Sequence, residues 1–255
     1  MKLNTNYHTH TVLCGHAVGD IKDYIDKAIA LGYETLGFSE HAPLPMHMFN
    51  DYDSKRLYAY ENMDMDTFYN LYLKRLHEAK GHCNLDIKIG LESEYLESND
   101  AFYKELRNNV EYMILGVHFF MYKGKLIDTY SEINKETMYA YADTIERALQ
   151  TKMFDYLAHP DLFLYNDIEF DSDARIVSER IIDSCIKHDV ILEINANGNG
   201  KYPRREFYEL VKNKPVKVMI GVDAHDPNRL MGKHIEEAIS LTKELGINVI
   251  EKLEV

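Results

Sequence analysis

Apolar segments of two kinds alternate along the whole chain. Short apolar runs, typical of buried strands, are separated by longer segments whose apolar residues recur at helical spacing. In the first of these longer segments, Ile21, Tyr24 and Ile25 follow the plausible N-cap Asp20, and Gly32 is a suitable stop. Strands are predicted at residues 3–7, 35–38, 85–91, 112–117, 154–158, 190–194 and 216–222. Helices are predicted at residues 20–31, 67–79, 99–109, 134–150, 171–188, 205–212 and 233–245.

Seven strands, each followed by a helix, predict a parallel α/β sheet, because parallel strands need a crossover connection. At 255 residues, with no linker or repeat, a single closed α/β barrel spanning residues 1–255 is favoured over two open sheets. Residues 42–66 contain Pro and Met but lack periodicity, which predicts a lid or loop over a site. Residues 122–125 predict a turn.

The composition limits the possible partners. The net charge of −13 argues against a nucleic-acid partner bound through a basic face, although bound metal ions would still allow a small anionic substrate. Cys14, Cys83 and Cys185 are widely spaced and odd in number, so we expect a reducing compartment and not a disulfide framework. The chain begins without an apolar signal core and has no run long enough to span a membrane. We therefore expect a cytoplasmic protein without a membrane partner; its oligomeric state is unknown.

Ionisable side chains gather where the predicted strands end. His8 and His10 alternate, so both imidazoles face the same side of the first strand end, and His16 follows on a loop after Gly15. Taken alone, these three histidines are as compatible with a chance occurrence on a solvent-exposed loop as with a metal site. The other strand ends favour the metal, since they bring further candidates to the same edge of a barrel. These candidates are His41, Glu92, His118, His159, Asp223 and His225.

The candidate ligands are seven His, one Glu and one Asp, too many for one catalytic ion. Two or three divalent ions fit this number, with Glu92 as the bridging carboxylate and Glu94 as its main alternative. Mixed imidazole and carboxylate ligation suits Zn, Mn or Fe. Cys14 is better explained as a packed residue than as a ligand. Clustered ions of this kind activate water and clamp phosphoryl oxygens, which predicts phosphoester hydrolysis.

The remaining histidines lie in predicted helices or linking segments, where surface or helix-end positions are expected. They are His47, His77, His82, His188 and His234.

Short motifs at these strand ends occur in the order typical of the PHP (polymerase and histidinol phosphatase) family, which the chain resembles over nearly its full length. The motifs are His8-Thr9-His10, His16, Ser39-Glu40-His41, Gly90-Leu91-Glu92, Gly116-Val117-His118, Ala158-His159-Pro160 and Asp223-Ala224-His225. The resemblance implies a distorted (β/α)7 barrel with a trinuclear metal site at the carboxyl ends of its strands. One ion would be held by His8, His10, Glu92 and Asp223, a second by Glu92, His118 and His159, and a third by His16, His41 and His225.

The family resemblance also implies a mechanism, in which a metal-bridging hydroxide attacks phosphorus. Asp223, Glu92 and His225 are the implied catalytic residues, and Asp223 is the candidate for handling a proton. The stand-alone size and the 42–66 segment are most similar to the branch of the family that hydrolyses L-histidinol phosphate.

The sequence departs from that branch after the sixth strand. Gly200 stands where an Arg is expected, and residues 161–165 lack a basic residue. Lys201, Arg204 or Arg205 would then contact the phosphate, although the two arginines also fit a solvated helix start. Alternative substrates are phosphotyrosine proteins, nucleotides, other small phosphoesters and nucleic-acid ends. A non-catalytic metal-binding module and an amidohydrolase are further alternatives; the latter would typically offer a Lys ligand at a strand end, which is not seen.

Overall fold

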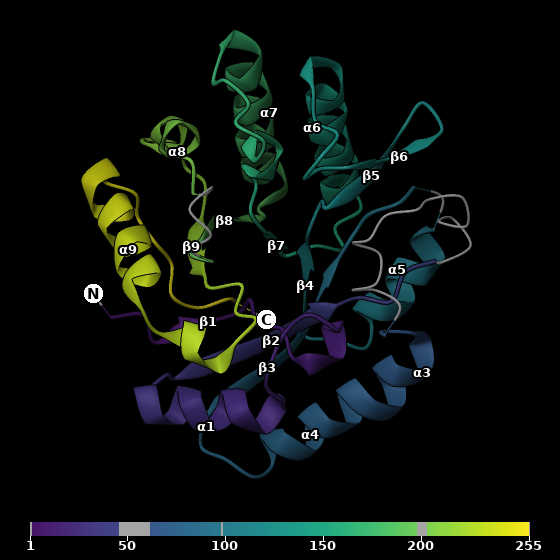
Figure 1. Cartoon of the computed structure of the whole chain (residues 1–255), viewed down its shortest axis with the longest axis vertical. Helices are drawn as coiled ribbons and strands as arrows, with labels where there is room; N and C mark the ends of the chain where they lie inside the picture. Colours follow the sequence, from purple (N-terminus) through teal and green to yellow (C-terminus); the bar gives the residue numbers. More distant parts are fainter. Residues whose placement is uncertain (1, 46–61, 98, 198–202, 255) are drawn as a thin grey trace.

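Seven parallel strands curl into a nearly closed ring in the computed structural model, which describes residues 2–45, 62–97, 99–197 and 203–254 (Figure 1). The strands, in their order around the ring, are β1 (Thr5–Asn6), β2 (Thr35–His41), β3 (Asp86–Ser93), β4 (Tyr112–Leu115), β7 (Tyr156–Leu157), β8 (Ile191–Asn195) and β9 (Val218–Gly221). Between the two end strands, Thr9 and Ala224 form a parallel bridge. His10 N donates to Ala224 O at 2.9 Å, and Ala224 N donates to His8 O at 3.1 Å. These contacts close the ring just beyond β1 and β9.

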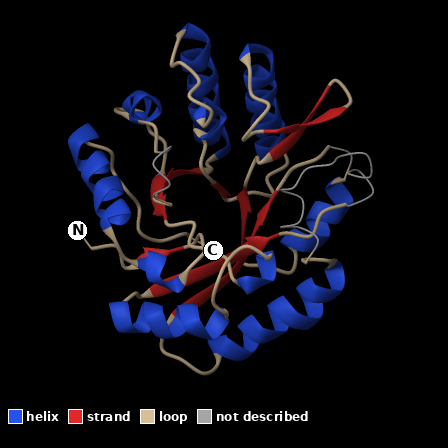
Figure 2. Cartoon of the chain, in the orientation of Figure 1, coloured by secondary structure: helices blue, strands red, loops and turns tan. Residues whose placement is uncertain are grey.

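Helices surround this ring on the outside (Figure 2). They are α1 (Ile21–Leu31), α3 (Met65–Thr67), the π-helical Phe68–Leu73, α4 (Lys74–Lys80), α5 (Asp100–Arg107), α6 (Lys135–Gln150), α7 (Ser172–His188), α8 (Arg205–Val211) and α9 (Lys233–Leu245). Their ends follow from local chemistry. Asp20 and Asp23 form a capping box at the start of α1, and Gly32 ends this helix with a left-handed φ of 73°. Asn134 and Thr137 form the corresponding box of α6.

Apolar side chains fill the barrel interior near the amino ends of the strands. Tyr112 and Tyr156, the first residues of β4 and β7, are fully buried there with Tyr7 and Leu253. The Tyr112 hydroxyl donates to Tyr7 O at 2.6 Å, and Leu253 N donates to the Tyr7 hydroxyl at 3.2 Å. Buried polar side chains gather at the other end of the barrel, where the strands end.

The prediction of seven parallel strands in one barrel is confirmed, with differences in detail. The segment around the predicted turn is an antiparallel hairpin of β5 (Phe119–Tyr122) and β6 (Lys125–Asp128). The sequence pattern does not indicate these strands, because each has only four residues, close to the minimum length of a strand. The predicted strand at 154–158 is reduced to β7. Most of the 42–66 segment lies outside the described residues, and its last part already begins α3. Among the helices that the structure describes, none has the length and apolar character needed to cross a membrane.

Candidate metal centre

The structure brings all nine predicted ligands together at the carboxyl ends of the strands. Each lies near at least one other member, and most are almost completely buried. His16 is exposed, and His225 is half-buried. The members are His8, His10, His16, His41, Glu92, His118, His159, Asp223 and His225.

Glu92, on β3, lies at the centre of the group. Its two oxygens face five imidazoles: Oε2 lies 3.3–3.4 Å from ring nitrogens of His8, His10 and His41, while Oε1 lies 2.9 Å from His159 and 3.6 Å from His118. Burial by itself raises the pKa of Glu92, but the neighbouring imidazoles, His8 foremost, hold that pKa well below its usual range. The carboxylate is therefore held in its charged form, with one oxygen toward His8, His10 and His41 and the other toward His118 and His159.

Asp223 faces the same space from the loop after β9. Its Oδ1 lies 3.6 Å from His8 Nε2 and 3.5 Å from His10 Nε2. The backbone of Asp223 is left-handed, with φ of 49°, and Asn197 Nδ2 donates to its carbonyl oxygen at 3.1 Å. His159 has a similar conformation, with φ of 29°. Both residues are held in a region that non-glycine residues rarely adopt, and such strain is concentrated at functional sites.

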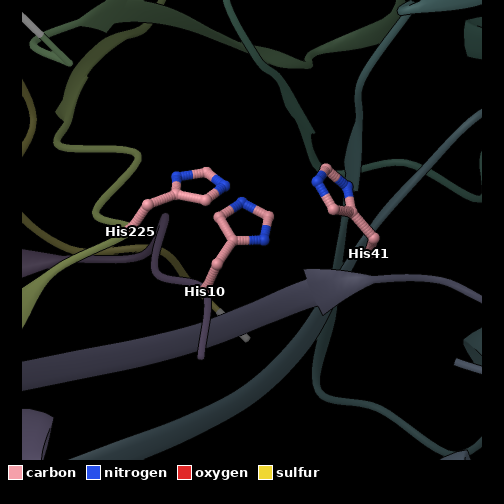
Figure 3. Close-up of side chains that lie close together, drawn as sticks. All are labelled: His10, His41 and His225. Carbon is pink, nitrogen blue, oxygen red and sulfur yellow. The ribbon is translucent and has the colours of Figure 1, made fainter. Parts of the chain in front are cut away.

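His10, His41 and His225 form a second group of imidazoles (Figure 3). The ring of His10 lies 4.3 Å from that of His225 and 4.4 Å from that of His41, and all three offer ligand atoms within 4.8 Å of one another. His16 extends the group, with its ring 4.6 Å from that of His225. Although His16 is exposed as a residue, partial burial of its imidazole and the nearby His225 lower its pKa to about 4, so the imidazole is neutral and can bind a metal at pH 7.

Several imidazole nitrogens in the centre are buried without a hydrogen bond to the described residues. They include Nε2 of His8, His10 and His225. A buried polar atom without a partner is costly, and an imidazole nitrogen is a good ligand for a divalent transition metal. The donor set therefore fits metal ions.

Three buried glutamates behind the centre each contact one histidine on Nδ1. Glu193 lies 2.8 Å from His8, Glu94 lies 2.6 Å from His118, and Glu40 lies 3.4 Å from His10. Such contacts leave the opposite nitrogen, Nε2, directed at the centre. The Nδ1 atoms of His16 and His225 contact backbone carbonyl oxygens in the same way.

Sequence reasoning missed Glu193 and misjudged Glu94. Glu193 is a charged residue within the apolar run of the sixth strand, which was the available signal, but only the end of that strand was considered. The expectation that Glu94 could bridge the ions is wrong. Since β3 ends at Ser93, strand alternation no longer applies, and Glu94 turns back to accept from the backbone of His118 and Phe119.

The predicted phosphate contacts have different surroundings. Lys201 lies outside the described residues. Arg204 donates through its backbone to Asp161, two residues after His159, and through Nη1 to Leu164 O at 3.0 Å. This puts Arg204 beside the loop that follows β7. Arg205 pairs with Glu244 of α9, and its contacts involve none of the nine candidate ligands.

The remaining described histidines lie outside the centre. His82 contacts the carbonyl oxygen of Glu78, His234 contacts that of Arg229, and His188 ends α7. His77 lies in the last turn of α4. His47 is not among the described residues. The expectation of surface or helix-end positions is confirmed for these four.

Comparison with known proteins assigns the chain to a protein family. The model of the PHP domain family matches residues 6–197, and the chain belongs to this family. A protein of Deinococcus radiodurans named probable histidinol-phosphatase is 23% identical over 94% of this chain and 92% of its own length. The histidinol-phosphatase of Bacillus subtilis is 32% identical, over 44% of this chain and 42% of its own length.

Solved structures agree on the fold. The histidinol phosphate phosphatase of Lactococcus lactis, in complex with zinc, L-histidinol and phosphate, has a TM-score of 0.72 at 18% identity, covering 98% of this chain and 96% of that one. A Listeria monocytogenes protein carrying the histidinol phosphatase name has a TM-score of 0.78 at 20% identity, covering 91% and 99%. The distorted barrel expected from the sequence is thus the fold of these proteins.

Proposed function

We propose that this protein is a metal-dependent phosphomonoesterase whose substrate is L-histidinol phosphate, and that residues 1–255 act as one catalytic domain. The observation that carries the proposal is that the buried Nε2 atoms of His8, His10 and His225, close to Glu92 and Asp223, have no hydrogen bond to the described residues. Membership of the PHP family and the names of the similar proteins support the reaction and the substrate.

The proposed centre uses the nine residues in three sets. These are His8, His10, Glu92 and Asp223; Glu92, His118 and His159; and His16, His41 and His225. Two or three divalent ions such as Zn, Mn or Fe would, when bound there, activate water and neutralise the charge of phosphoryl oxygens.

The chain's own residues prepare the site for this chemistry. Glu92 presents one oxygen to each side of the centre, so that it can serve two sets at once. Burial by itself raises the pKa of Asp223, but His8 and His225 hold that pKa well below its usual range. The Asp223 carboxyl group is therefore held in its charged form. Of the predicted phosphate-binding residues that the structure describes, we propose that Arg204, beside the loop after β7, binds the phosphate group of the substrate.

Phosphate release tests the proposal directly. The protein is assayed with added Mn or Zn on L-histidinol phosphate, p-nitrophenyl phosphate, AMP and a phosphotyrosine peptide. We expect kcat/KM for L-histidinol phosphate to lead by about a hundredfold or more, which is about 2.7 kcal/mol of transition-state discrimination. Equal and slow hydrolysis of all four would refute the substrate and retain the chemistry.

Two controls test the role of the metal centre. Glu92→Ala and His118→Ala should abolish turnover and lower the bound metal, while the circular dichroism spectrum of the barrel is retained. Normal kinetics in either variant would exclude the proposed ligand sets. A metal-loaded wild-type protein that hydrolyses no phosphoester would favour a non-catalytic metal-binding module.

A further inference from the structure

Glu193 is a fully buried carboxylate outside the proposed ligand sets. It lies on β8, the strand whose end contributes no proposed ligand. Four hydrogen-bond donors converge on it: Oε1 lies 2.8 Å from His8 Nδ1 and 3.0 Å from the Tyr156 hydroxyl, and Oε2 lies 2.7 Å from His159 N and 2.9 Å from Asn195 Nδ2. The two oxygens thus join β7, β8 and the segment that follows β1 behind the centre.

The surroundings enclose this carboxyl group tightly. A Cβ atom added to Gly221 would lie only 1.9 Å from Glu193 Oε1 and 2.6 Å from the Tyr156 hydroxyl. The glycine on β9 therefore provides the space that Oε1 occupies. Since the group is tightly enclosed and accepts from four donors, its geometry is fixed by the barrel and not by solvent.

From these contacts we infer that Glu193 is a positioning residue for the metal centre. It fixes His8 with the proton on Nδ1, so that Nε2 is available to a metal. It also anchors the backbone of His159, whose left-handed conformation aims Nε2 at Glu92, 2.9 Å away. One carboxylate thereby positions ligands from two of the proposed sets. This inference rests on the proposed metal-dependent function.

The four donors around Glu193 are satisfied only if both of its side-chain oxygens accept hydrogen bonds. In a Glu193→Gln variant, one of the two oxygens becomes an NH2 group, which can donate but not accept. If the NH2 group replaces Oε2, it opposes the N–H groups of His159 and Asn195. If it replaces Oε1, His8 must accept at Nδ1 and carry its proton on Nε2, where it blocks metal binding. Either orientation disturbs a proposed ligand.

Zinc affinity measures this positioning separately from turnover. The dissociation constant is determined by competition with a chromophoric chelator, for wild type, Glu193→Gln and Tyr156→Phe. We expect a 10–100-fold weaker affinity in Glu193→Gln, as for other residues that orient metal ligands. Tyr156→Phe removes one donor to the same oxygen but leaves His8 in place, so its affinity should stay within about threefold of wild type. Glu237→Gln, on the exposed face of α9, serves as the surface control.

The results separate positioning from a purely structural role. A lowered melting temperature of Glu193→Gln with unchanged zinc affinity would overturn the inference. A second measurement needs no variant: in zinc-loaded wild type with 15N-labelled histidine, the His8 ring must show a protonated, slowly exchanging Nδ1. A proton on Nε2 instead would also overturn it. Failure of the proposed substrate would appear independently, as absence of L-histidinol phosphate turnover in wild type.

Discussion

Gly116, just after β4, gives Glu92 the space it needs, and Gly116→Ala is the sharpest test of the centre. A Cβ atom at this position would lie 2.5 Å from Glu92 Oε1 and 2.9 Å from Cγ and Cδ. The backbone of Gly116 does not have a positive φ, so alanine is compatible with its conformation. The substitution therefore perturbs the space beside Glu92 and not the chain path.

The size of the effect follows from this distance. To reach 3.4 Å, the lower end of ordinary van der Waals contact, Oε1 must move by about 0.9 Å. That movement disturbs the contacts of Oε1 with His159 at 2.9 Å and with His118 at 3.6 Å. Misplacement of a catalytic group by about 1 Å can cost about a hundredfold in rate, and overpacking costs about 1–3 kcal/mol of stability.

The assay compares metal content, kcat/KM and melting temperature in Gly116→Ala and in a matched control. Gly81→Ala is suitable, since a Cβ atom there would meet only Glu78 O at 3.7 Å. We expect a loss of about a hundredfold in kcat/KM and of bound metal for Gly116→Ala, with little change for Gly81→Ala. Wild-type metal content and turnover in Gly116→Ala would show that Glu92 is not constrained by this contact, and would refute the reasoning.

Two further predictions concern thiols and bound metal. Burial, with Glu40 nearby, raises the pKa of Cys14 to about 12, and Cys185 is fully buried, so at pH 8 a thiol reagent such as DTNB should label only Cys83 in the native protein and all three cysteines after denaturation. Rapid native labelling of Cys14 would contradict the described burial. Removal of metal with EDTA should lower the melting temperature by about 5–10 °C, the shift expected when an ion at about a hundred times its Kd is withdrawn. The Glu92→Ala variant is the control, since its melting temperature should respond much less; an equal response in both would argue against binding at Glu92.

The fold was predictable because hydrophobic periodicity and capping agree along most of the chain. Asp20 and Gly32 bound α1 as expected, and apolar runs marked all seven strands of the barrel. The hairpin at Phe119–Tyr122 and Lys125–Asp128 was not recognised, because a run of four residues beside a short turn has too few positions to show a period.

The candidate site was predictable to the extent that its residues stand at strand ends. That rule found the nine candidate ligands, because parallel strands bring their carboxyl ends to one edge. It could not find Glu193, whose partners lie 185 residues away at His8 and 34 residues away at His159. It also gave Glu94 the wrong direction, since the backbone leaves the strand one residue earlier. Contacts behind the ligands depend on packing between distant strands, which periodicity does not report.

Closure of the ring between β1 and β9 has a consequence for the order of events during synthesis. Val222 N donates to Asn6 Oδ1 across a sequence separation of 216 residues, and Val18 N donates to His225 O. The first three histidines therefore leave the ribosome long before Asp223 and His225, their partners in the centre. A chain with many contacts between residues far apart in the sequence folds slowly. Until it has folded, the imidazoles near the N-terminus are exposed to any available ion. The proposed ligand sets therefore require docking of the last strand before they are complete.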